Sequence, residues 1–199
     1  MAVPISLVVE DEISEHTIRQ VLAQCGREFT VGNVIGKRGS SYLRSRIVDL
    51  NRAARGWPFL VLTDLDRYQC PAELVHRWLS VPRHPNLLFR VAVQEVEAWL
   101  LADRSAFATF LGISRDLIPD NAEQVDNPKE FVVSLARRSR KRDVRESLVP
   151  REGSTARVGR DYNGRLVSFV NADWQAVEAQ KRSPSLKRTM DLLRRFDPQ

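Results

Sequence analysis

The chain has 199 residues and a formal net charge of +6, with 43% apolar and 28% charged residues. This length allows one domain with a substantial buried core, and the composition is that of an ordinary globular protein. No apolar run is long enough to span a membrane. The apolar run near the start of the chain is too short for a signal peptide, and acidic residues follow it. The two cysteines and three scattered histidines indicate neither a disulfide framework nor a zinc site, so we expect a cytoplasmic protein.

The first half of the chain alternates between predicted strands and predicted helices. The strands are expected at residues 4–10, 29–35, 59–66 and 87–93, and the helices at 13–25, 42–54, 71–79 and 95–103. The third strand is a continuous apolar run, which is typical of a strand buried on both faces of a parallel sheet. This order predicts parallel pairing with right-handed crossovers.

From about residue 105 the pattern changes to helices and loops without clear strands. We expect a polar connection at 119–128, a basic helix at 129–140, a Gly/Arg-rich loop at 150–164, and helices at 166–180 and 185–196. Ser183 and Pro184 predict the start of the last helix. The sequence therefore predicts an α/β core at residues 1–104 and a helical, basic C-terminal extension at 105–199 that packs on it.

The positive charge is concentrated in one part of this extension. Residues 136–165 hold ten Lys and Arg against four acids, whereas the rest of the chain holds 21 of each. Such a segment suits the phosphates of a nucleic acid, while a solvated helix face or a protein contact is the other interpretation. The densest run consists of Arg137, Arg138, Arg140, Lys141 and Arg142.

Two of the predicted strands run directly into acidic residues. The first ends in Glu10, followed by Asp11 and Glu12, and the third ends in Asp64-Leu65-Asp66. The carboxyl ends of parallel strands meet at one edge of a sheet, where α/β proteins bind ligands. Carboxylates gathered there predict a site for Mg²⁺ or Mn²⁺. Alternate residues of a strand share a face, so Asp64 and Asp66 would point the same way if the strand continued to residue 66.

Other roles are open for each of these acids. An aspartate after a buried strand is often a helix cap or a turn residue, although the pair together with Glu10 favours a metal site. Glu95 and Glu97 follow the fourth strand, where they are further metal ligands or acids favoured in the first turn of a helix by its dipole.

The glutamate after one strand and the Asp-x-Asp after another resemble the Toprim fold, which occurs in topoisomerases, primases and the overcoming-lysogenisation-defect nucleases. Residues 95–103, a Glu-x-Glu-Ala followed by an apolar helix and Asp, resemble a Toprim-like bacterial family of unknown function. Residues 182–188, Arg-Ser-Pro-Ser-Leu-Lys-Arg, resemble the end of that family's chains. Together these similarities extend over nearly the whole chain.

The resemblance implies a Toprim-like parallel sheet of about four strands flanked by helices. It implies that Glu10 serves in acid/base chemistry or metal binding and that Asp64 and Asp66 hold magnesium. It further implies a Mg²⁺-dependent endonuclease acting on DNA or RNA, with an ATPase as partner subunit and a role in phage defence. One departure is Asp11, which stands where Toprim domains usually have Gly and either crowds the metal or points into the first helix.

Two other classes of protein compete with this interpretation. The same acids resemble the pocket and acceptor strand of a response-regulator receiver domain, a phosphorylation switch that uses Mg²⁺ without nuclease activity. A receiver needs Ser or Thr at the end of the next strand and Lys at the end of the one after, and neither is found here. The third class is a non-catalytic protein-binding subunit that keeps the Toprim shape.

Overall fold

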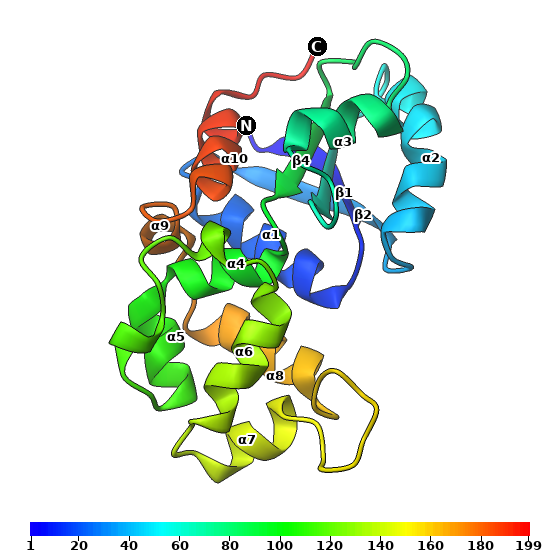
Figure 1. Cartoon of the computed structure of the whole chain (residues 1–199). Helices are drawn as coiled ribbons and strands as arrows, with labels where there is room; N and C mark the ends of the chain where they lie inside the picture. Colours follow the sequence, from blue (N-terminus) through cyan, green and yellow to red (C-terminus); the bar gives the residue numbers. More distant parts are fainter.

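The computed structural model describes residues 1–199 as a four-stranded sheet joined to a group of helices (Figure 1). All four strands are parallel, in the order β2-β1-β3-β4. This confirms the predicted α/β class and parallel sheet. The strands are β1 (Val3–Val9), β2 (Phe29–Gly36), β3 (Phe59–Asp64) and β4 (Leu87–Ala92).

Helices connect the strands and make up the rest of the chain. None of them is both long enough and apolar enough to cross a bilayer. The helices are α1 (Glu12–Gln24), α2 (Ser40–Ala53), α3 (Pro71–Trp78), α4 (Val96–Ala102), α5 (Arg104–Leu111), α6 (Pro128–Arg137), α7 (Arg142–Leu148), α8 (Tyr162–Ala172), α9 (Ala176–Ala179) and α10 (Pro184–Arg195), with 3-10 turns at Arg115–Leu117 and Ala122–Gln124.

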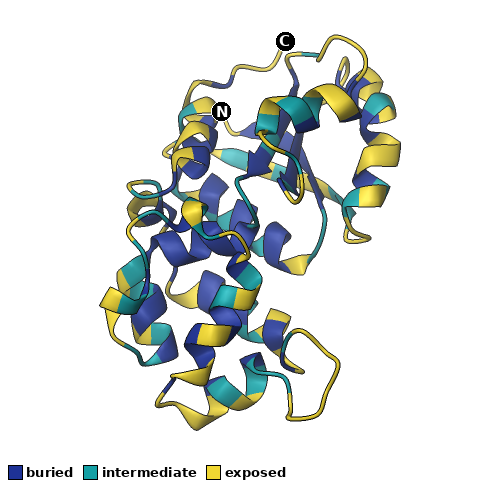
Figure 2. Ribbon diagram, viewed as in Figure 1, coloured by how far each residue is buried: buried dark blue, intermediate teal, exposed yellow.

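The two faces of the sheet are buried against different layers. One face packs on α2 and α3 through a cluster of 14 buried residues, among them Val61 and Phe89. The other face packs on α1, which is itself covered by the C-terminal helices in a cluster of 41 buried residues, including Ile5, Leu62 and Phe169. Figure 2 shows this continuous buried interior extending from the strands into the helical region. Core and extension therefore share one hydrophobic core.

Several element boundaries differ from the prediction. The third strand ends at Asp64 rather than residue 66, and the basic helix ends at Arg137 rather than residue 140. The helix expected at 166–180 is divided into α8 and α9. The division follows from tertiary contacts: the Trp174 indole donates a hydrogen bond of 3.2 Å to the Trp99 carbonyl, and the Asp103 carboxylate accepts one of 3.1 Å from the Gln175 amide.

Glycine is required at position 36, where β2 ends beside β1. Gly36 has φ of 115°, and a Cβ atom there would lie 2.1 Å from the Val9 carbonyl oxygen. The next residue, Lys37, donates its backbone N–H to the same oxygen at 2.9 Å and pairs its ammonium with Glu15 at 2.5 Å. These contacts fix the carboxyl end of β1, directly before the predicted acidic site.

Candidate active site

Glu10 follows β1 and reaches across to the end of β3. Its carboxylate oxygen Oε1 accepts hydrogen bonds from the Thr63 hydroxyl and from the Asp64 backbone amide, the latter at 3.0 Å. Burial raises the pKa of Glu10, hydrogen bonds from Thr63 and Asp64 offset part of the rise, and the negative charges of Asp66 and Asp11 add to it. The two strand ends are therefore joined through the Glu10 carboxyl group, whose pKa lies above its ordinary value.

Asp64 is the last residue of β3, and its carboxylate faces the start of α4. Its Oδ1 accepts a hydrogen bond of 2.9 Å from the backbone amide of Val96, the first residue of that helix. Burial raises the pKa of Asp64 well above its ordinary value, and the negative charges of Glu97 and Glu10 raise it further. Asp64 is thus both a helix-end acceptor and the centre of a repulsive cluster.

Glu97 is the most deeply buried of the predicted site residues, with 2% of its surface exposed. The Tyr162 hydroxyl donates a hydrogen bond of 3.2 Å to its Oε1, and the Lys129 ammonium lies 3.5 Å from the same oxygen. Burial raises the pKa of Glu97, and the positive charge of Lys129 offsets only part of this rise. The structure thus joins Glu97 to Asp64 in one electrostatic group.

Lys129 is a site residue that the sequence did not indicate, because 32 positions separate it from Glu97. Burial alone would lower the pKa of Lys129, but the charges of Glu97, Glu95 and Asp64 outweigh burial and raise the pKa. The backbone amide of Lys129 also donates a hydrogen bond of 2.7 Å to the Glu95 carboxylate. One carboxylate oxygen of Glu95 therefore anchors the start of α6.

Asp66 does not lie on a strand face with Asp64. It is exposed and has φ of 49°, and its amide and that of Leu65 both donate to the carbonyl of Gln94, itself at φ of 64°. Asp11 caps α1 by accepting a hydrogen bond of 2.8 Å from the Ser14 amide. Of the two orientations expected for Asp11, the structure therefore shows the one towards the first helix.

The donor chemistry of this cluster fits a hard divalent cation, but the present side-chain conformations do not enclose one. No three Asp, Glu, His or Cys side chains form a group that could hold a metal ion. Glu10 and Asp64 each use one carboxylate oxygen in protein hydrogen bonds and have a second oxygen without such a bond. A metal held here requires side-chain rotation that brings these oxygens together with Asp66 or Glu97.

A polar cavity of about 730 Å³ adjoins the acidic cluster. Asp66 and Glu95 line it, so both predicted ligands are accessible from it. Three arginines from distant parts of the sequence also line it: Arg44 on α2, Arg67 after β3, and Arg157 in the loop before α8. Guanidinium groups are well suited to bind phosphates, and in this cavity they lie beside two carboxylates.

The predicted basic run lies elsewhere, between α6 and α7 at the far end of the helical region from the sheet (Figure 1). The rise of α6 places Arg137 about 12 Å along the helix axis from Lys129. The Lys141 ammonium donates hydrogen bonds to the carbonyls of Thr109 and Phe110 at 2.8 and 3.1 Å, which satisfies the end of α5. Arg137, Arg138, Arg140 and Arg142 are all exposed, and Arg142 also pairs with Glu146 on its own helix.

No protein-family model and no curated protein matches the chain. Among solved structures, the chain is similar to the C-terminal region of the Burkholderia pseudomallei OLD protein, with a TM-score of 0.49 and 15% sequence identity over 96% of each chain. A similarity of this size does not establish membership of a family.

Proposed function

We propose that the protein cleaves phosphodiester bonds of DNA or RNA and uses Mg²⁺ or Mn²⁺ to do so. The observation that carries the proposal is the group of Glu10, Asp64 and Glu97 at the carboxyl edge of the sheet. Burial raises the pKa of each of these carboxyl groups, and Lys129 offsets part of the rise at Glu97 alone. A structure that keeps several acids in mutual repulsion gains stability from a bound cation, and this is typical of metal-dependent phosphoryl chemistry.

Each charged group in or beside the polar cavity has a role in this proposal. A bound divalent cation would neutralise the carboxylates and polarise the phosphate to be cleaved. Glu10, Asp64 and Asp66 would supply oxygen ligands, with Glu95 and Glu97 in supporting positions. Lys129 would place a positive charge beside the developing negative charge on the phosphate. The flanking phosphates would bind the arginines that line the cavity, namely Arg44, Arg67 and Arg157.

The receiver alternative has less support from the fold. A receiver carries its lysine at the end of a fifth strand, and here the chain forms no strand after Ala92. Two further parts of the proposal, an ATPase partner subunit and a role in phage defence, are supported by the sequence resemblance alone. A non-catalytic Toprim-like subunit would cleave nothing, so a cleavage assay distinguishes it from a nuclease.

The test is cleavage of supercoiled plasmid and of labelled single-stranded DNA and RNA with Mn²⁺, Mg²⁺ or EDTA. We expect metal-dependent nicking that Asp64→Asn abolishes. The matched control is Asp49→Asn, which changes an exposed acid on α2 that forms ion pairs with Arg46 and Arg52. Stable phosphorylation of Asp64 by a small phosphodonor, without nicking, would contradict the proposal.

A further inference from the structure

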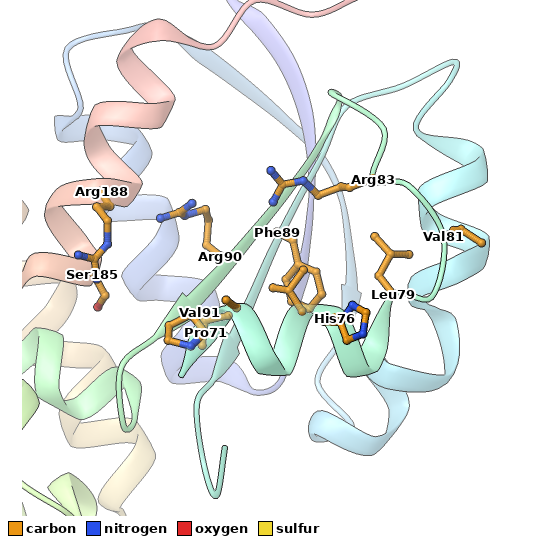
Figure 3. Close-up of a pocket in the computed structure, with 12 residues that line it drawn as sticks. Pro71, His76, Leu79, Val81, Arg83, Phe89, Arg90, Val91, Ser185 and Arg188 are labelled. Atoms are coloured by element: carbon orange, nitrogen blue, oxygen red, sulfur yellow. The ribbon is translucent and has the colours of Figure 1, made fainter. Parts of the chain in front are cut away.

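A second cavity, of about 510 Å³, lies between α3, β4 and α10 (Figure 3). It shares no lining residue with the cavity beside the acidic cluster. β4 is an edge strand, so its outer side faces this cavity rather than a further strand. One wall is apolar, with contributions from Val75, Leu79 and Phe89.

Three arginines line the same cavity without a carboxylate partner. Arg83 precedes β4, Arg90 lies on β4, and Arg188 lies on α10. The acids on α3 and α10 form ion pairs with other cations: Glu73 pairs with Arg77 at 2.9 Å, and Asp191, which lines a neighbouring cavity with Arg90 and Arg188, pairs with Lys187 and Arg194. Figure 3 shows Arg83 and Arg90 extending their guanidinium groups towards α10.

Arg90 is held in place inside this group. Its Nε donates a hydrogen bond of 3.1 Å to the Thr189 hydroxyl, which fixes the guanidinium plane and leaves its terminal nitrogens available. Burial, and then the positive charges of Arg83 and Arg188, lower the pKa of Arg90 to about 10. The group still carries its charge at neutral pH. Like charges gathered around one half-buried guanidinium are unfavourable unless an anion joins them.

We propose that this cavity binds a nucleoside phosphate, with the phosphates on Arg83, Arg90 and Arg188 and the base against the apolar wall. The volume lies in the range of small-ligand sites, and the pairing of an apolar wall with a few polar groups, here one held guanidinium and two exposed ones, is typical of them. Arginine binds phosphate in a bidentate manner. The apolar half favours a nucleoside over bare phosphate, and the gathering of all three arginines in one cavity favours a mononucleotide over a nucleic-acid strand.

Binding is measured by calorimetry with ATP, GTP, AMP, adenosine and inorganic pyrophosphate, in EDTA and on the Asp64→Asn protein. These conditions prevent metal-dependent binding and turnover at the acidic cluster, so the result is independent of the proposed nuclease activity. We expect the nucleoside triphosphates to bind, and adenosine and pyrophosphate each to bind about tenfold more weakly or worse, because each lacks half of the contacts.

Arg83 and Arg188 are exposed, so their replacement by Ala is not expected to disturb the fold. Each variant should lose about tenfold or more in affinity. Arg77→Ala, on the same helix as the apolar wall, is the control and should bind as the parent does. Absence of binding at millimolar nucleotide, or undiminished affinity in Arg83→Ala/Arg188→Ala, would overturn the proposal. Pyrophosphate binding as tightly as ATP, or an oligonucleotide binding more tightly than either, would overturn it as well.

Discussion

Asp64 and Val96 are joined by a hydrogen bond of 2.9 Å, in which the first amide of α4 donates to the Asp64 carboxylate. This contact gives Asp64 two separable effects. Its Oδ1 accepts a hydrogen bond from an amide at the start of a helix, while its negative charge is repelled by the negative charges of Glu97 and Glu10. Asparagine keeps an acceptor and removes the charge, whereas alanine removes both.

We therefore expect Asp64→Asn, without metal, to melt at the same temperature as the parent or higher, because the repulsion is relieved. Asp64→Ala should lose about 1 kcal/mol relative to Asp64→Asn, because an amide at the start of α4 loses its acceptor. In both variants the rise in melting temperature on adding Mn²⁺ should be smaller than in the parent, since a ligand stabilises only as far as it binds the native state. Melting curves with EDTA and with Mn²⁺ measure all of these effects. A lower melting temperature for Asp64→Asn with an undiminished metal shift would rule out the metal site.

Lys129 and Glu97 should be energetically coupled, because removing the ammonium leaves a buried carboxylate without its cation. Lys129→Met is expected to lower the free energy of unfolding by about 1–3 kcal/mol. The double variant Lys129→Met/Glu97→Gln should lose less free energy of unfolding than the two single variants lose in sum. Urea unfolding of the four proteins at neutral pH measures the coupling. Lys181→Met, which removes an exposed partner of Glu178, is the control and should change stability little.

Glu15 should make stability depend on pH. Burial would raise the pKa of Glu15, but hydrogen bonds with Lys37 and Arg19 outweigh burial and lower it below 4.5. Its contribution is therefore present above the unfolded pKa and is lost as pH falls through the folded value. Glu15→Gln should reduce the free energy of unfolding at neutral pH, and the difference from the parent should narrow below about pH 4. Urea unfolding of parent and variant from neutral pH to below pH 4 measures this difference in free energy. Glu12→Gln, which changes an exposed acid, is the control. A constant difference at all pH values would show that only packing was lost.

The arginines of the polar cavity should affect both nucleic-acid binding and cleavage, whereas the basic run should affect binding alone. Replacing Arg44, Arg67 and Arg157 by Ala should lower the slope of log affinity against log salt by about 0.9 per lost phosphate contact and should also abolish cleavage. Replacing Arg137, Arg138 and Arg140 should lower the slope while cleavage at saturation persists.

Two residues of the run are left out of the second set: Lys141, because its ammonium satisfies carbonyls at the end of α5, and Arg142, because it pairs with Glu146. Filter binding at several salt concentrations gives the slopes. An unchanged slope for the second set would mean that the run is a solvated face or a protein contact.

The sheet and the acids at its edge could be predicted because both depend on local patterns. The run from Phe59 to Asp64 is apolar enough to identify a buried strand, and parallel strands necessarily end at one edge. The position of Asp66 could not be predicted in this way. Its backbone turns into the left-handed region because two consecutive amides, of Leu65 and Asp66, bind the carbonyl of Gln94.

Long-range packing also determines the parts of the site that the sequence did not indicate. Lys129 belongs to the site because Glu95 anchors the start of α6 and Glu97 is buried beside it. Arg157 belongs to the basic segment that the sequence indicated, but its place in the cavity beside Asp66 and Glu95 depends on how the loop before α8 folds back. The break between α8 and α9 likewise depends on Trp99 and Asp103, more than 60 residues earlier in the chain.

The arrangement of the core has a consequence for biosynthesis. All four strands precede residue 93, but α1, on one face of the sheet, is covered by helices from the last third of the chain. At about 5–20 residues per second, the ribosome completes the strands roughly 5–20 seconds before α8 to α10 exist to cover that layer. During this interval a broad apolar surface is open to water. The nascent chain should therefore be a strong client of chaperones until the final helix emerges.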